Sequence, residues 1–400
     1  MADEHMRANR MNARVMALQY GVVWCLVGLL IGCGAPKPKP PDQAKAELPT
    51  ESPAASPMII AAGDAHTCLV NPDKTAACWG DNQYGQLGDG TTAAAKAPVA
   101  VAHLAYVAAV AAGEWHTCAA LTTGQVKCWG DNSLWQLGVT TPRRSSTPVL
   151  SPVGPATQIA AGRTHTCAIL IDGKVVCWGD NRTSQTGVQR EPLAKPSLPV
   201  IVPTVSDAIA IAAGSEHSCA VQKDGQLLCW GDNHFGQLGH GIMEHHSFPP
   251  SPVPIAGKAL AVTAGRRHTC ALLQDRTVQC WGKGFEGQLG DGLKKDSLTP
   301  VRVLAPEPAG AASPLEHVAA ITAGSQHTCA LLENGQVYCW GSNAAGQLGR
   351  VQGAMAARPV FSQFTEVVAV AAGGWHTCAL RASGATTCVG QMEPKEGEEQ

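Results

Sequence analysis

Short apolar runs, interrupted by Gly, Asn and Asp at regular places, fill most of the chain after residue 58. In residues 318–349, the runs VAAITAG, HTCALL and QVYCWG are separated by polar turns such as ENG. A further short run, Pro359-Val360-Phe361, follows a loop that begins SNAAGQLG. Runs of about four to eight residues bounded by turn residues are typical of strands. The pattern therefore predicts an all-β chain.

This pattern returns seven times, with substitutions. Each repeat reads AAG-x-x-H-[TS]-C-A, then C-W-G-[DS]-N-x-x-G-Q-L-G, with nine residues between its two Cys. Four short antiparallel strands in a repeat of this length are typical of one propeller blade. We expect seven blades in residues 58–390. Successive repeated histidines are 49 to 59 residues apart: His66, His116, His165, His217, His268, His327 and His376.

The amino end predicts export. Residues 1–32 carry Arg7, Arg10 and Arg14 before an apolar stretch that is too short to span a membrane comfortably, as in a signal peptide. The end of this stretch, Leu30-Ile31-Gly32-Cys33, resembles the bacterial lipobox, which implies an acylated Cys33 at the mature amino terminus. A signal peptide that merely contains a Cys, or an uncleaved anchor helix, is the alternative. We expect lipid anchoring in the bacterial cell envelope, at the outer membrane.

Two further segments flank the predicted propeller. Residues 33–57 hold Cys33 and a stretch rich in Pro, Ala and charge, which predicts an extended tether. Residues 391–400 form an acidic tail. The seven hairpins are accompanied by only six Pro-Val-type fourth strands, so one blade lacks a strand. Since an unpaired edge frays, we expect the segment just before Met58 to supply it; a three-stranded blade is the alternative.

The combined motifs V-x-x-[VI]-[AT]-A-G-x-x-H-[TS]-C-A and W-G-x-N-x-x-G-Q-L-G resemble the regulator-of-chromosome-condensation repeat, over residues 58–390. The resemblance implies a closed seven-bladed β-propeller that presents loops to other proteins. The last repeat departs from the pattern, because Val389 follows Cys388 and no GQLG comes after it. The nucleotide-exchange and chromatin roles known in this family are not expected here, since the chain is predicted to be exported and lacks a basic tail.

Fourteen of the 16 Cys form seven pairs of identical spacing. A three-residue loop such as Glu333-Asn334-Gly335 places Cys329 opposite Cys339, at a separation that a disulfide allows. The last loop residue favours a left-handed backbone, and Gly occupies it in five repeats, but Lys74 and Arg276 in the other two. We expect seven disulfides: Cys68–Cys78, Cys118–Cys128, Cys167–Cys177, Cys219–Cys229, Cys270–Cys280, Cys329–Cys339 and Cys378–Cys388.

Two alternatives for these cysteines stay open: free buried thiols, or metal sites that add the His of H-x-C. No fourth ligand recurs, so we expect no metal and read the histidine as structural, bonded to a neighbouring backbone turn. The Trp after the second Cys is expected to pack between blades. The loop of residues 240–251 holds His240, His245 and His246, but no carboxylate or Cys set supports a metal there.

Repeated residues build the scaffold, and residues that vary between repeats are the candidates for function. The G-x-x-H loop and the W-G-x-N loop are expected on one face, with the hairpin turn on the other. Aromatic and arginine side chains dominate binding hot spots. The predicted partner-binding residues on this face are Tyr84, Trp115, Trp135, Arg163, Phe235, Arg266, Arg267, Phe285 and Trp375.

These features favour a monomeric protein-interaction scaffold of the envelope. A structural or adhesive envelope component is the alternative, and an enzyme acting on polysaccharide is a third reading. G-x-S-x-G, H-E-x-x-H and P-loop patterns are absent, and no carboxylate pair stands out, so we assign no catalytic residue and no cofactor. The net charge of −2 gives no global field that would attract nucleic acid.

Overall fold

The computed structural model describes residues 59–189, 196–307, 313–349 and 351–392. All of them belong to the second of the two units into which the chain divides, Ala55–Gln400. The predicted signal peptide, Cys33, the tether and residues 393–400 of the acidic tail lie outside the described residues. Within the described ranges, no helix is long and apolar enough to cross a membrane.

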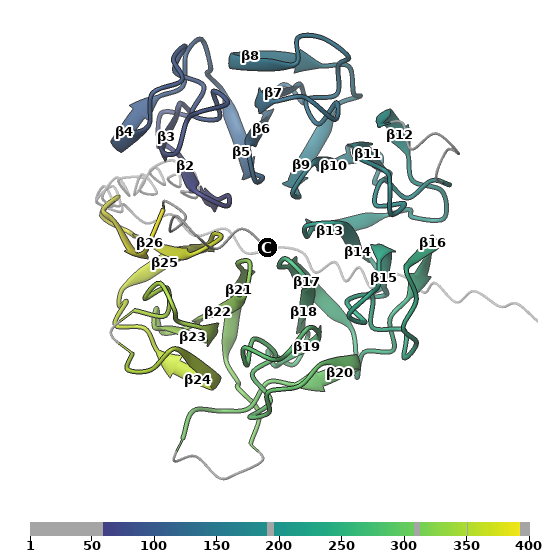
Figure 1. Ribbon diagram of the computed structural model, residues 1–400, viewed down its shortest axis with the longest axis vertical. Helices are drawn as coiled ribbons and strands as arrows, with labels where there is room; N and C mark the ends of the chain where they lie inside the picture. Colours follow the sequence, from purple (N-terminus) through teal and green to yellow (C-terminus); the bar gives the residue numbers. More distant parts are fainter. Residues whose placement is uncertain (1–58, 190–195, 308–312, 350, 393–400) are drawn as a thin grey trace, which may run out of the picture. The chain divides into compact units, whose positions relative to one another are not determined.

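The described residues form 27 strands in seven antiparallel sheets, which surround a common centre as blades (Figure 1). Six sheets contain four strands in chain order, and the seventh contains three. The predicted all-β, seven-bladed propeller is therefore confirmed.

Each blade runs outward from its first strand. The first strands lie nearest the centre: β1 (Ile59–Ala62), β5 (Val107–Ala112), β9 (Ala156–Ala161), β13 (Ala208–Ala213), β17 (Ala259–Ala264), β21 (Val318–Ala323) and β25 (Val367–Ala372). The second strands begin at the repeated His: β2 (His66–Val70), β6 (His116–Leu121), β10 (His165–Leu170), β14 (His217–Gln222), β18 (His268–Leu273), β22 (His327–Leu332) and β26 (His376–Arg381). The third strands carry the second Cys: β3 (Ala76–Gly80), β7 (Val126–Asp131), β11 (Val175–Gly179), β15 (Leu227–Asp232), β19 (Val278–Gly282), β23 (Val337–Ser342) and β27 (Thr386–Gly390). Six outer strands complete the blades: β4 (Ala95–Ala100), β8 (Arg144–Ser151), β12 (Ser197–Ile201), β16 (His246–Pro252), β20 (Ser297–Arg302) and β24 (Met355–Phe361).

The hairpin between the second and third strands aligns the two Cys of every repeat. In β22 and β23, for example, Cys329 lies directly opposite Cys339. All seven predicted disulfides are present, with Cα atoms 4.0 to 4.1 Å apart. The free-thiol and metal alternatives are therefore excluded for these cysteines. Lys74 and Arg276 adopt φ angles of 64° and 63° in the loop position that the other five repeats fill with Gly.

The Trp of the third strand joins neighbouring blades, as predicted. Trp129 is fully buried, and its Nε1 donates to the backbone oxygen of Gln86 in the preceding blade over 2.9 Å. Leu87, beside Gln86, is fully buried in the same cluster. The same Trp-to-Gln bond recurs at Trp178, Trp230, Trp281 and Trp340. Five of the third-strand loops thus serve as the docking point for the Trp of the next blade.

The repeated histidine also links blades, but not through the partner that we expected. Its Nε2 lies 2.7 to 2.9 Å from a hydroxyl of the next blade, which is the Thr or Ser that follows that blade's own His. The prediction of a backbone turn as partner was wrong. Adjacent strand residues point to opposite faces of a sheet, so each blade presents its His on one side and its hydroxyl on the other.

The hydroxyl fixes the protonation of the ring. Thr117, for example, donates its proton to the backbone oxygen of Gln86 over 2.8 Å. It must therefore accept from His66, which carries its proton on Nε2. The last link, from His376 back to Thr67, joins the seventh blade to the first and completes a ring of seven such bonds.

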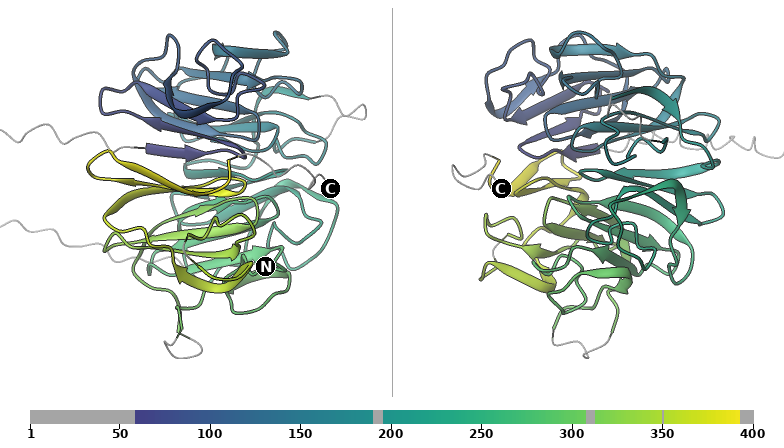
Figure 2. Two further views of the ribbon diagram at one scale, coloured as in Figure 1. Left: turned by 60° about the vertical axis from the view of Figure 1, so that its left-hand side comes forward. Right: turned by 45° about the vertical axis from the view of Figure 1, so that its right-hand side comes forward.

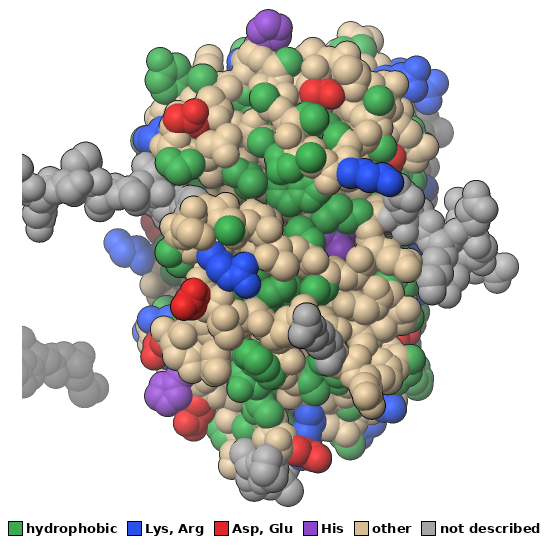
Figure 3. Space-filling model, turned by 90° about the vertical axis from the view of Figure 1, so that its left-hand side faces the viewer, with side chains coloured by type: hydrophobic (Ala, Val, Ile, Leu, Met, Phe, Trp, Pro, Cys, Tyr) green, Lys and Arg blue, Asp and Glu red, His purple; other side chains and the backbone are tan. Residues whose placement is uncertain are grey.

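The seventh blade ends at β27, so this strand forms an edge in the part of the chain that the structure describes. Cys388 in β27 is only half-buried, whereas the third-strand cysteines of the other blades are fully buried. Hydrophobic side chains gather on the side of the ring seen in Figure 3. The segment before Met58, expected to supply a fourth strand, lies outside the described residues, so that strand stays a prediction.

Candidate partner-binding face

In the six four-stranded blades, two loops meet at one end of the sheet. The antiparallel strand order places the loop after the first strand and the loop after the third strand at the same end, and the hairpin turn at the other (Figure 2). In all seven blades, the residue after the third-strand Gly donates its N–H to the carbonyl of the residue before the repeated His, over 2.8 to 2.9 Å. We call the surface formed by these two sets of loops the loop face.

Buried polar side chains hold each third-strand loop in one shape. In the second blade, Asn132 accepts a hydrogen bond from the N–H of Leu137 over 3.0 Å. Gln136 donates to Asp131 over 2.7 Å and accepts from the N–H of Leu134 over 2.9 Å. A loop held by its own hydrogen bonds loses little entropy when it binds a partner. The variable side chains of the loop face therefore stand on a rigid frame.

Two contacts on this face cross from one blade to the next. The ring centroids of Tyr84 in the first blade and Trp115 in the second are 5.3 Å apart. The guanidinium of Arg267 in the fifth blade lies over the Phe235 ring of the fourth, 4.6 Å from its centroid. In both cases a third-strand loop meets the first loop of the following blade. Such contacts fix the orientation of large side chains before any partner arrives.

Charged side chains cluster where the first loops of several blades approach one another. Arg163 donates to Glu114 over 2.6 Å and lies 3.8 Å from the Glu216 carboxylate. Ser325 donates to Asp64 over 3.2 Å. Burial raises the pKa of both Asp64 and Glu114 above the ordinary carboxyl values, although nearby arginines act in the opposite direction. These carboxylates are therefore held in a partly desolvated, internally paired network.

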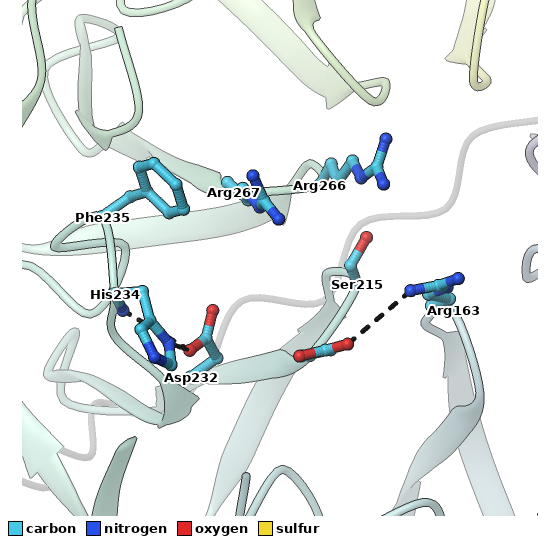
Figure 4. Close-up of a pocket in the computed structure, with 8 residues that line it drawn as sticks. Arg163, Ser215, Asp232, His234, Phe235, Arg266 and Arg267 are labelled. Atoms are coloured by element: carbon cyan, nitrogen blue, oxygen red, sulfur yellow. Dashed lines mark hydrogen bonds and ion pairs between the residues drawn. The ribbon is translucent and has the colours of Figure 1, made fainter. Parts of the chain in front are cut away.

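A pocket of about 390 Å³ is lined by loops of the third, fourth and fifth blades (Figure 4). We call it the arginine pocket; its lining residues are Arg163, Ser215, Glu216, Asp232, His234, Phe235, Arg266 and Arg267. Within it, Asp232 accepts hydrogen bonds from His234 and Gln237. Nε2 of His234 lies 2.7 Å from Nδ1 of His245. Among the described residues, no group of three His, Cys, Asp or Glu side chains has the arrangement to hold a metal ion.

The family is shown by comparison with known proteins. A family model for the RCC1-like domain matches residues 32–313. Models of the regulator of chromosome condensation repeat match residues 318–347 and 334–380. The chain belongs to the RCC1-like domain family.

Relatives of this RCC1-like propeller include the ultraviolet-B receptor UVR8 of Arabidopsis thaliana, 34% identical over 140 residues, which are 35% of this chain and 30% of that protein. The regulator of chromosome condensation of Mus musculus is 32% identical over 164 residues, 40% of this chain and 37% of that protein. The chain thus spans well under half the length of these curated relatives. The crystal structure of Prp20p from Saccharomyces cerevisiae matches with a TM-score of 0.67 and 22% identity, covering 84% of this chain and 83% of that one, which shows the shared fold.

The RCC1-like propeller brings only some of the predicted partner-binding residues together. Four of them line the arginine pocket: Arg163, Phe235, Arg266 and Arg267. Tyr84 and Trp115 form their own pair between the first and second blades. The remaining three do not line this pocket: Trp135 and Trp375 lie in loops of the second and seventh blades, and Phe285 lies in the third-strand loop of the fifth blade.

Four pocket residues are not among the predicted partner-binding residues: Ser215, Glu216, Asp232 and His234. Asp232 follows a repeated C-W-G and therefore reads as scaffold, and Ser215 is small and polar, with no hot-spot character. The available signal is positional. Ser215 follows a repeated Gly directly, at the place that Arg163 and Arg266 occupy in their own repeats.

Proposed function

We propose that this RCC1-like propeller is a monomeric binding scaffold, anchored in the bacterial cell envelope through an acylated Cys33, that holds a protein partner on its loop face. The observation that carries the proposal is the set of aromatic and arginine side chains at non-repeating positions of a hydrogen-bonded loop frame. The Tyr84–Trp115 and Phe235–Arg267 contacts are of the residue types that dominate protein-interaction hot spots.

Two further observations support the proposal. Seven disulfides are expected in a protein that folds in an oxidising compartment, which fits export through the amino-terminal segment. The related protein Prp20p binds Gsp1p and histones, so the same fold serves protein partners elsewhere. The partner proposed here is a different one, an envelope or extracellular protein.

Affinity capture from an envelope extract tests the loop face. The binding-face variant changes Trp115, Trp135, Phe285 and Trp375 to Ala. The control changes four exposed apolar residues at the opposite end of the blades: Leu150→Ala, Ile171→Ala, Ile201→Ala and Val368→Ala. Circular dichroism verifies that both variants are folded.

A partner retained by the parent and by the control, but lost by the binding-face variant, supports the proposal. Equal capture by all three proteins, or none by any, contradicts it and favours the structural or adhesive role. The anchor is tested separately by labelling cells with a radioactive fatty acid. We expect label on the parent protein and none on Cys33→Ser. Label on both proteins, or on neither, would refute lipidation at Cys33.

A further inference from the structure

We propose that the arginine pocket binds carboxylate side chains of an acidic segment in the protein partner, an inference that rests on the proposed function and specifies its ligand chemistry. Three observations support it: the sequence difference between the fifth repeat and the other six, the pairing of charges in the pocket, and the contact of Arg267 with Phe235.

The two residues between the repeated Gly and His are not required by the fold, because every repeat fills them differently. The fifth repeat has Arg266-Arg267 there. The other six have Asp64-Ala65, Glu114-Trp115, Arg163-Thr164, Ser215-Glu216, Ser325-Gln326 and Gly374-Trp375. Two adjacent arginines therefore occur at this place in one repeat of seven, and the arginine pocket lies at that repeat.

The acidic groups of the pocket have polar partners, whereas the side chains of Arg266 and Arg267 make no hydrogen bond or ion pair with the described residues. Glu216 lies 3.8 Å from Arg163, and Asp232 accepts from His234 and Gln237. In the part of the chain that the structure describes, no carboxylate lies within ion-pair distance of Arg266 or Arg267. Arg266 influences Asp64 and Glu114 only by longer-range attraction. Among the residues that the structure describes, none accepts a hydrogen bond from either guanidinium group.

The contact with Phe235 orients the Arg267 side chain in a way that suits binding of a planar anion. Its guanidinium carbon lies over the Phe235 ring, 4.6 Å from the ring centroid (Figure 4), and the Arg267 residue is exposed to solvent. A guanidinium edge matches the two oxygens of a carboxylate, and a stacked arginine loses less freedom on binding than a mobile one. Ser215 and Arg266 line the same pocket and add a hydroxyl and a second guanidinium.

The shape and the mixed charge of the surface select the class of partner. A volume of about 390 Å³ accommodates a few side chains of an extended peptide. A nucleic-acid duplex or an anionic bilayer needs positive charge spread over a broad surface. Here Glu216 and Asp232 line the same pocket, and the chain carries a net charge of −2. A localised donor site of this kind fits an acidic peptide segment.

Fluorescence anisotropy with a labelled deca-glutamate peptide tests the inference on the purified full chain at low salt. The pocket variant is Arg266→Ala/Arg267→Ala. The matched control is Arg143→Ala/Arg144→Ala, which removes the other adjacent arginine pair and changes the net charge equally. The parent and the control are expected to bind the peptide alike. The pocket variant should bind at least about tenfold more weakly, since two charge-assisted contacts are lost.

A charge-retaining variant separates geometry from bulk charge. Arg266→Lys/Arg267→Lys should bind severalfold more weakly than the parent, because lysine cannot present two parallel donors to a carboxylate. Undiminished binding by this variant overturns the geometric assignment. Failure of the parent to bind the peptide, or equal weakening in the pocket variant and the control, overturns the carboxylate site. Arginine-dependent binding of duplex DNA or phosphatidylglycerol vesicles, without peptide binding, overturns the partner class.

These outcomes are distinguishable from failure of the proposed function. Suppose that the parent and the pocket variant capture an envelope partner equally, and that the variant with four aromatic residues changed to Ala does not. This result supports the loop face as the binding surface and refutes the acidic ligand. If no envelope partner is captured, while the peptide binds in an Arg266- and Arg267-dependent manner, the carboxylate site stands and the proposed recruitment falls.

Discussion

Acidification is expected to destabilise this propeller through its seven ring histidines. Burial lowers the pKa of His66, His116, His217, His268 and His327 to about 3, and of His165 and His376 to about 4. Nδ1 of each has no hydrogen-bond partner among the described residues, so a proton placed there would have no acceptor. The unfolded chain, with histidine pKa values of about 6.5, therefore binds more protons than the folded chain as pH falls.

The sign and size follow from these pKa values. The seven neutral histidines contribute fully to the free energy of unfolding above pH 6.5, which is about the pKa of histidine in the unfolded chain. This contribution is lost as the pH falls toward the pKa values of the same histidines in the folded chain. At pH 5 each histidine lowers the free energy of unfolding by about 2 kcal/mol relative to pH 8. Seven together amount to about 14 kcal/mol, which equals the whole stability of many domains. The raised pKa values of Asp64 and Glu114 act in the opposite direction, but they are two groups against seven.

Urea unfolding followed by tryptophan fluorescence, with the disulfides intact, measures this effect between pH 8 and pH 5. Near pH 5, the slope of the free energy against pH should correspond to an uptake of about six to seven protons on unfolding. His217→Gln keeps an N–H donor for Thr269 and should reduce the uptake by about one proton. A free energy that stays constant over this range, or a slope that is unchanged in the variant, would refute the reasoning.

Three other predictions concern the scaffold and are measured by urea unfolding at pH 8. Cys329→Ala/Cys339→Ala opens one of the seven cross-strand links and should lower the free energy of unfolding by about 3 kcal/mol. Lys74→Gly should raise it by about 0.5–1 kcal/mol, because Lys74 has a φ of 64°, whereas Lys174→Gly, outside the left-handed region, should bring no gain. Thr377→Val leaves both His327 and the Gln347 carbonyl without their partner and should cost about 2–4 kcal/mol. Thr377→Ser should cost much less, since Ser218 fills the same role in another blade.

Each of these predictions has an outcome that contradicts it. An unchanged urea midpoint in the double Cys variant would mean that the cross-strand link does not constrain the unfolded chain. Equal effects of the Lys74 and Lys174 changes would remove the argument from backbone strain. If Val and Ser at position 377 were equally tolerated, the hydroxyl would not be the link between blades.

The elements that the sequence predicted well are those whose partners lie close along the chain. The Cys pairs are 10 residues apart and are joined by a tight turn, so spacing alone set their register. Lys74 and Arg276 could likewise be placed in a left-handed turn position before their φ angles were known. Local geometry therefore accounts for the hairpins and for the number of blades.

Contacts between blades could not be predicted in this way. His66 and Thr117 are 51 residues apart, and they meet because curvature of the ring brings neighbouring sheets together. The same holds for Arg163 and Glu114. One rule emerges from the structure: Tyr84–Trp115 and Phe235–Arg267 both join a third-strand loop to the residue before the next blade's His. The Tyr84–Trp115 contact alone, applied to the fourth and fifth repeats, would have paired Phe235 with Arg267 and pointed to the arginine pocket.

The central claim is that a partner binds the loop face. Hydrogen–deuterium exchange on the full chain, with and without a captured partner, tests it most directly. The account predicts slower exchange in the loops that contain Trp115, Phe235 and Arg267, and no change in the hairpin turns at Gly124, Gly225 and Gly335 on the opposite face. Protection confined to those hairpin turns or to the outer strands, with the loop face unchanged, would contradict it.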